Sequence, residues 1–210
     1  MQFGTCLPHL LQNIWEADPE NGPVLLSKWD ISDGFHRCLL RPADVGAFTY
    51  VVPPIPEDPA IYLCVDLVLP MVWVNSPPLF CAAYETAADL ANTYLENPQT
   101  PWRPYVPTKG IYVTTPNNAA SSNRLKKVEV YMDDFMEMTQ GDPDQQERVT
   151  ELLLQAIKEI FPSVPKETKD FISLKKALQG DVSWLPVKDI LEWILNTKKG
   201  PLQLTEKLHL

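Results

Sequence analysis

Apolar residues recur at helical spacing in three separate stretches of the chain. They predict a short helix that starts near Leu7 and ends near Asp18, and a longer helix that begins at Ser76. The third helix has the clearest start, because Asp142 and Pro143 stand directly before a long apolar face that ends at Phe161. These patterns predict three helices, each with one buried side.

Other apolar segments have the length and flanking residues of β-strands. A buried strand is predicted to run directly into Asp30, and two further strands flank a proline-rich loop. A fourth and a fifth strand surround Asp133 and Asp134, which is the pattern of a hairpin with an acidic turn. The predicted strands are 24–29, 48–52, 61–69, 128–131 and 135–138.

The segment from Glu96 to Ser122 is rich in Pro, Asn, Thr and Ser, and it predicts a surface excursion inserted between core elements. We expect an antiparallel sheet packed on the helices that begin near Ser76 and Asp142.

Length and composition limit the kind of protein. The chain has 210 residues, 45% of them hydrophobic, which suits one domain or one domain with part of a second. No apolar run approaches the roughly 18 residues that span a bilayer, and no signal peptide is recognisable at the start. We therefore expect an intracellular protein, cytoplasmic or nuclear, without a membrane partner.

Charge and cysteine content narrow the chemistry further. The four cysteines are scattered and favour reduced core residues over a zinc site. A net charge of -9 argues against broad attraction to nucleic acid, because phosphate contacts are normally made by clustered Lys and Arg. Any role on nucleic acid must therefore depend on local chemistry.

Three carboxylates form the strongest candidate for chemistry. Asp30 ends one predicted strand, while Asp133 and Asp134 stand at the hairpin turn. Such a set could share two divalent cations that activate a 3'-hydroxyl and hold a triphosphate, and Mg²⁺ prefers oxygen ligands of this kind. Each acid alone is more typical of an ordinary solvated turn than of a metal site, and periodicity does not bring the three together.

Five ordered motifs resemble those of reverse transcriptases of the retroviral and retrotransposon type. The first three are SKWDISDGF at Ser27–Phe35, LPMVWVNSP at Leu69–Pro77 and YMDDF at Tyr131–Phe135. SLKKA at Ser173–Ala177 resembles the fourth motif, and Leu191–Trp193 resembles the strand that grips the primer.

The resemblance implies an α+β fold, a polymerase palm in which an antiparallel sheet packs on helices, with remnants of the fingers and the start of the thumb. Residues 1–190 would form the palm with partial fingers and the insertion near 96–122. Residues 191–210 would form the primer-grip strand and the beginning of the thumb.

The resemblance also implies roles for individual residues. Asp30, Asp133 and Asp134 would bind Mg²⁺, or Mn²⁺ in its place, and Lys176 or its neighbour Lys175 would protonate the leaving pyrophosphate. The nucleotide would meet the carbonyl of Ile31, the side chains of Met71 and Val72, and the ring of Phe35 as a steric gate against ribonucleotides. Primer and template would lie near Tyr131, Met132 and Trp193. The alternative interpretations are a core aromatic for Phe35 and a solvated face for the lysine pair.

Two positions depart from the family pattern. Val72 and Glu192 stand where these enzymes carry glycine, a residue used where backbone approaches a ligand closely or takes an unusual conformation. Few residues precede the first motif and the chain stops at Leu210, so we expect most of the fingers and the thumb to be missing.

Three hypotheses follow. The first is an RNA-directed DNA polymerase that adds deoxynucleotides to a DNA primer on an RNA or DNA template. The second, favoured by Val72, Glu192 and the missing fingers for this isolated chain, is an inactive retroelement-derived palm that serves as a fold or a nucleic-acid-binding module. An unrelated α/β binding domain is the third.

Overall fold

The chain divides into two units in the computed structural model, which describes residues 5–97, 124–161, 170–198 and 203–206. The larger unit comprises Met1–Ser32 and Cys81–Leu210, and the smaller unit comprises Asp33–Phe80. The predicted excursion between residues 96 and 122 lies outside the described residues from residue 98 onward, together with the strand predicted within it.

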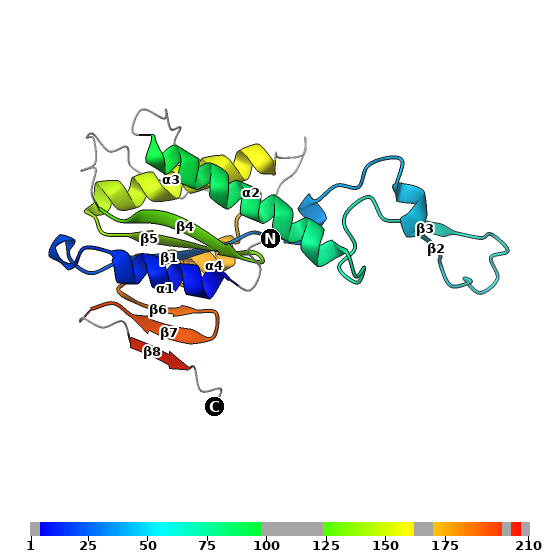
Figure 1. Cartoon of the computed structure of the whole chain (residues 1–210). Coiled ribbons are helices and arrows are strands. Elements are labelled where there is room, and N and C mark those ends of the chain that lie inside the picture. The colour runs from blue at the N-terminus through cyan, green and yellow to red at the C-terminus, as the bar shows by residue number, and fades with distance from the viewer. Residues whose placement is uncertain (1–4, 98–123, 162–169, 199–202, 207–210) are drawn as a thin grey trace. The chain divides into compact units, whose positions relative to one another are not determined.

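The larger unit is built on a three-stranded antiparallel sheet (Figure 1). Its strands are β1 (Leu25–Asp30), β4 (Lys126–Tyr131) and β5 (Asp134–Thr139), in the order β1-β5-β4. The register places Asp134 opposite both Asp30 of β1 and Tyr131 of β4. The predicted strand into Asp30 and the predicted hairpin are therefore confirmed.

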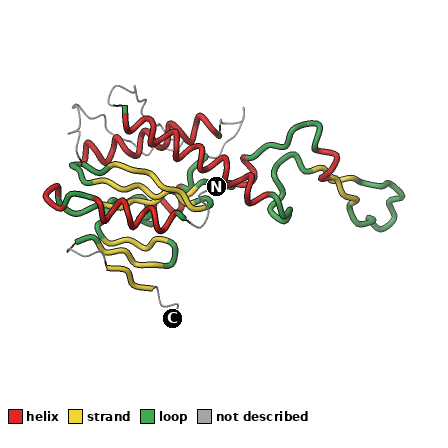
Figure 2. The backbone as a smooth tube through the Cα atoms, viewed as in Figure 1, coloured by secondary structure: helices red, strands yellow, loops and turns green. Residues whose placement is uncertain are grey.

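Helices cover both faces of this sheet, as Figure 2 shows. Helix α1 (Cys6–Glu16) lies on one face, while α3 (Pro143–Ile160) and the Cys81–Glu96 part of α2 (Ser76–Glu96) lie on the other (Figure 1). Side chains of β5 alternate between the two: Phe135 stacks on Tyr84 of α2 with ring centroids 5.6 Å apart, whereas Met136 joins the α1 core. Side chains on both faces of β5 are buried, so helices cover both faces of the strand.

The predicted helix boundaries are confirmed to within a residue or two. Helix α2 begins at Ser76, and α3 begins at Pro143. The Asp142 carboxylate accepts a hydrogen bond from the Gln145 backbone N–H at 3.0 Å, which satisfies one of the free donors at the start of α3. None of the described helices combines the length and hydropathy needed to cross a bilayer.

A second antiparallel sheet in the larger unit contains β6 (Val187–Ile190), β7 (Trp193–Asn196) and β8 (Gln203–Glu206). Leu191 and Glu192 form the two-residue turn between β6 and β7, with φ of 51° and 68°. The prediction that Leu191–Trp193 forms a strand is therefore wrong for its first two residues, because the chain reverses there. Only Trp193 belongs to the strand.

The smaller unit contains one hairpin, formed by β2 (Thr49–Val51) and β3 (Leu63–Val65). Both strands are shorter than the predicted segments 48–52 and 61–69. The prolines between them supply no backbone N–H for pairing, which limits the ladder on that side. With mixed helices and antiparallel strands, the chain has an α+β fold.

Candidate metal centre

Three aspartates meet at one end of the central sheet. Asp30 is the last residue of β1, Asp134 is the first residue of β5 directly opposite it, and Asp133 stands in the turn between β4 and β5. Each offers a carboxylate oxygen, and these oxygens all lie within 4.8 Å of one another. The structure therefore brings together the carboxylates that the sequence could only propose separately.

The tight turn that precedes Asp134 positions Asp133. Met132 and Asp133 are its two central residues, and Met132 has a φ of 56°. A positive φ at the first central position is typical of the hairpin turns that favour glycine there, and a larger side chain in this region is strained by about 1–2 kcal/mol. The strained residue, Met132, stands directly before two candidate ligands, Asp133 and Asp134.

Helix α4 (Leu174–Leu178) brings Lys176 to the same cluster. The Ser173 N–H donates to the Asp30 carbonyl at 2.8 Å, and the Ser32 N–H donates to the Phe171 carbonyl at 2.9 Å. These bonds hold the segment before α4 beside the end of β1. Lys176 Nζ then lies 2.6 Å from Asp30 Oδ1 and 3.9 Å from Asp134 Oδ1.

A second lysine reaches the cluster from β1 itself. Lys28 lies two residues before Asp30 on the same face of the strand, and its Nζ is 3.8 Å from Asp134 Oδ2. The same Nζ is 3.5 Å from Asp181 Oδ2, so Lys28 joins a fourth carboxylate to the group. Two ammonium groups thus face four carboxylates.

Burial makes the cluster electrostatically unfavourable for its carboxylates. Side-chain exposure is 10% for Asp30 and 23% for Asp134. Burial raises the pKa of Asp134, and the charges of Asp133 and Asp30 raise it further, against the lowering effect of Lys28 and Lys176. For Lys176, burial lowers the pKa, but the hydrogen bond and charge of Asp30 outweigh it and raise the pKa overall.

One carboxylate oxygen of the cluster lacks a hydrogen-bond donor among the described residues. Asp134 Oδ1 is buried and accepts no hydrogen bond from the described part of the chain. Buried carboxylate oxygens normally have donors or a metal, and three converging carboxylates are the oxygen-rich surroundings that Mg²⁺ and Mn²⁺ prefer. The bridge between Ile31 and Ile172 uses the Asp30 carbonyl and the Ser32 N–H, so the Ile31 carbonyl takes no part in it.

The residues predicted to contact primer and template have structural roles as well. Tyr131 and Trp193 are half-buried and pack against the core on the α1 side of the central sheet. Met132 occupies the strained turn position. Packing and primer contact are compatible for such side chains, so their predicted roles remain predictions.

Apart from Ile31, which lies in the larger unit, the residues predicted to line the nucleotide belong to the smaller unit. The Phe35 ring stacks on Phe80, with centroids 4.0 Å apart and planes 5° from parallel. The exposed fraction is 67% for Met71 and 97% for Val72. Phe35 thus has a packing partner of its own, and its role as a steric gate stays a prediction.

Sequence reasoning missed two members of the cluster. Lys28 could have been found, because residues two apart on a strand share a face and Asp30 was already a candidate. Asp181 gave no local signal, since it follows α4 in a loop. No protein-family model and no curated protein matches the sequence.

Proposed function

We propose that the larger unit is the palm of a reverse-transcriptase-type polymerase whose Asp30, Asp133 and Asp134 bind divalent cations for nucleotidyl transfer. The observation that carries the proposal is the convergence of these carboxylate oxygens within 4.8 Å at the end of one antiparallel sheet. Strand order and turn geometry bring them from two segments more than a hundred residues apart.

The residues around the cluster have defined tasks in this proposal. Bound Mg²⁺, or Mn²⁺ in its place, would activate the primer 3'-hydroxyl and neutralise the triphosphate. Asp30 and Asp133 would ligate the cations, with Asp134 beside them near the primer end. Lys176 would exchange its ion pair with Asp30 for the leaving pyrophosphate and donate a proton to it.

Partners and specificity follow from the same proposal. The substrates would be deoxynucleoside triphosphates and a DNA primer on an RNA or DNA template. Phe35 would exclude the 2'-hydroxyl, with Met71, Val72 and the Ile31 carbonyl beside the nucleotide. Because the chain is acidic overall, we expect nucleic acid to be held by a few local contacts near Tyr131, Met132 and Trp193.

Specific observations favour an inactive palm as the second candidate function. Lys176 and Lys28 already neutralise part of the carboxylate charge, as structural counterions would. Val72 and Glu192 add side chains where the related enzymes have glycine. Such a domain would retain the fold, or bind nucleic acid, without chemistry.

Mn²⁺ binding by the full chain tests the first requirement of the proposed polymerase, which is that the three aspartates ligate a divalent cation. We expect water-proton relaxation to detect Mn²⁺ on the wild type, and Asp133→Asn to weaken it. Asp133 is exposed, so the variant should keep its fold. Asp144→Asn, an exposed acid at the start of α3, makes the same charge change elsewhere and should leave binding unaltered. Equal affinity in the two variants would contradict the metal centre.

Primer extension with deoxynucleotides then separates the polymerase from the inactive palm. Extension that disappears in Asp133→Asn supports the polymerase, whereas metal binding without extension supports the inactive palm. In an active chain, Phe35→Ala should raise ribonucleotide use relative to deoxynucleotide use. Restoring glycine at Val72 and Glu192 should increase extension if those side chains obstruct it.

A further inference from the structure

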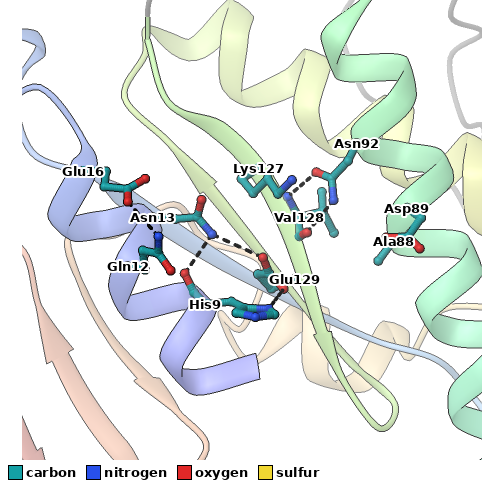
Figure 3. A pocket seen from close by; sticks show the side chains of 10 residues that line it. All are labelled: His9, Gln12, Asn13, Glu16, Ala88, Asp89, Asn92, Lys127, Val128 and Glu129. Carbon is teal, nitrogen blue, oxygen red and sulfur yellow. Dashed lines mark hydrogen bonds and ion pairs between the residues drawn. The ribbon is translucent and has the colours of Figure 1, made fainter. Parts of the chain in front are cut away.

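A polar cavity of about 310 Å³ lies on the opposite side of β4 from the β5 strand, between α1 and α2 (Figure 3). Helix α1 contributes His9, Asn13 and Glu16, helix α2 contributes Asp89 and Asn92, and β4 contributes Glu129. All of these residues belong to the larger unit. None of them is part of the aspartate cluster.

Fixed contacts between α2 and the edge strand shape the cavity. β4 is an outer strand of the central sheet, so its outward backbone groups need partners. The Asn92 side chain supplies them at Val128: its Oδ1 accepts from the Val128 N–H at 2.9 Å, and its Nδ2 donates to the Val128 carbonyl at 2.8 Å. These two bonds anchor α2 beside the strand, and the cavity lies next to them.

The inner wall of the cavity carries a buried carboxylate with an incomplete set of partners. Glu129 is only 5% exposed. Its Oε1 accepts a hydrogen bond from Asn13 Nδ2 at 3.2 Å, but its Oε2 lies 3.9 Å from His9 Nδ1, beyond hydrogen-bonding distance. Among the described residues, His9 is the basic side chain within 4.0 Å of this carboxylate, and it forms an ion pair only when its imidazole is protonated. A buried carboxylate in such surroundings is unfavourable unless a cation completes it.

The charges around the cavity select the kind of ligand. Glu16, Asp89 and Glu129 are acidic, and Lys127 is the one basic residue of fixed charge in the lining. Burial raises the pKa of Glu129, Asp89 raises it too, and His9, Lys127 and Asn13 lower it. In the described chain, the set of side chains close enough to hold a metal ion is the aspartate cluster, so this cavity suits an organic cation better.

We propose that this cavity binds a primary ammonium or guanidinium group, with Glu129 Oε2 as its direct counterion and Asp89 and Glu16 around it. The volume lies at the small end of ligand sites, which suits one cationic head on a short aliphatic stem. Lys127, on the same face of β4 as Glu129, competes with the ligand for the carboxylate. The cation can come from a free small amine or from a Lys or Arg side chain of a polypeptide.

Binding of methylguanidinium to the full chain, followed by ¹H–¹⁵N NMR of the Asn13 and Asn92 side-chain amides, tests the site. N-methylurea, which has a similar shape without the charge, is the matched probe. We expect saturable shifts with methylguanidinium and none with N-methylurea. Glu129→Gln should weaken binding about tenfold, because the charge-assisted hydrogen bond is lost while the Asn13 contact can persist.

Matched variants separate the site from general charge effects. Lys127→Met should tighten binding, whereas Lys158→Met, an exposed lysine near the end of α3, should not. Glu20→Gln, outside the cavity, should bind as the wild type does. If Glu129→Gln fails to fold, Asp89→Asn at an exposed position serves in its place, with a smaller loss of affinity.

Equal binding of N-methylurea, or full affinity in a folded Glu129→Gln chain, would overturn the proposal. The peptide acetyl-Gly-Arg-Gly-amide distinguishes the two sources of the cation. Tighter binding of the peptide than of methylguanidinium indicates a polypeptide partner, and equal or weaker binding indicates a small amine. Asp133→Asn should not change any of these affinities, so failure here is distinguishable from failure of the metal centre.

Discussion

The β4–β5 and β6–β7 hairpins reverse through loops of the same length, but they use their turns differently. In both, non-glycine residues adopt positive φ: Met132 in the first, and Leu191 with Glu192 in the second. Only the first turn is followed by an acid that pairs with another acid across a neighbouring strand. Turn geometry alone therefore does not create a candidate metal site. The pairing of β5 with β1 is also needed, because it adds the carboxylate of Asp30.

The two hairpins also differ in how their buried ionisable side chains are hydrogen-bonded. Glu137 of β5 is fully buried, and its Oε2 accepts from Trp29 Nε1 at 3.0 Å and Thr150 Oγ1 at 3.1 Å. Its Oε1 has no hydrogen-bond partner in the described chain. Lys188 of β6 instead donates to the carbonyls of Ser183 at 2.7 Å and Gly180 at 3.1 Å. The first hairpin thus contains an incompletely satisfied carboxylate, and the second an ammonium group with carbonyl partners.

Glu137→Gln should produce the largest change, because it removes the buried titratable carboxyl group of the first hairpin. Burial raises the pKa of Glu137 from 4.5 to about 7. Between these values the folded protein keeps a proton that the unfolded chain loses, so this group lowers stability as pH rises. Over that range the wild type should lose about 3 kcal/mol relative to Glu137→Gln.

Urea unfolding from pH 4.5 to pH 8 measures this difference. The exposed control Glu20→Gln should follow the wild-type profile. Parallel profiles for Glu137→Gln and the wild type would mean that the carboxylate is ionised throughout the range.

Lys188→Met should destabilise the protein by about 1–3 kcal/mol, since it leaves the carbonyls of Gly180 and Ser183 without their donor. Lys188 and Glu137 also attract one another. In a double-mutant cycle, the loss should therefore be smaller when Glu137 is already glutamine. Strict additivity would show that the two buried charges do not interact.

Lys176→Met should raise the affinity for Mn²⁺ by about tenfold, because it removes a competing cation from Asp30. The gain is limited because solvent partly screens the attraction between Lys176 and Asp30. Lys175→Met is the matched control, since Lys175 is exposed and its neighbour makes the contact. If primer extension is present, Lys176→Met should slow it while binding metal more tightly. A fall in Mn²⁺ affinity would contradict competition between lysine and metal.

Glycine in the two turns should give the smallest effects. Glu192→Gly should stabilise by about 0.5–1 kcal/mol, because relief of left-handed strain exceeds the added flexibility of the unfolded chain. Glu192→Ala retains the strain and should gain nothing. Met132→Gly should also relieve strain, but it should lower Mn²⁺ affinity because that turn positions Asp133. Unfolding curves and Mn²⁺ titrations of the three variants compare the hairpins directly.

Much of the local structure could be predicted from the sequence. Helical periodicity and the Asp142 cap located α3, and the two apolar segments on either side of Asp133 and Asp134 located the β4–β5 hairpin, because these signals depend on neighbouring residues. The same logic misplaced Leu191 and Glu192, whose side chains do not signal a turn that normally prefers Gly or Asn. It also overestimated the lengths of β2 and β3, because the prolines between them limit strand pairing.

The tertiary structure alone decided which side chains meet. No local pattern places Lys176, rather than Lys175, against Asp30, because Lys176 lies 146 residues after Asp30 in the sequence. The same holds for Asp181 beside Lys28 and for Asn13 against Glu129. Periodicity determines which face of an element is buried, whereas the partner of that face depends on strand order and helix docking. Those are set by the packing of many apolar side chains across distant segments, and they bring the charged groups together as a consequence.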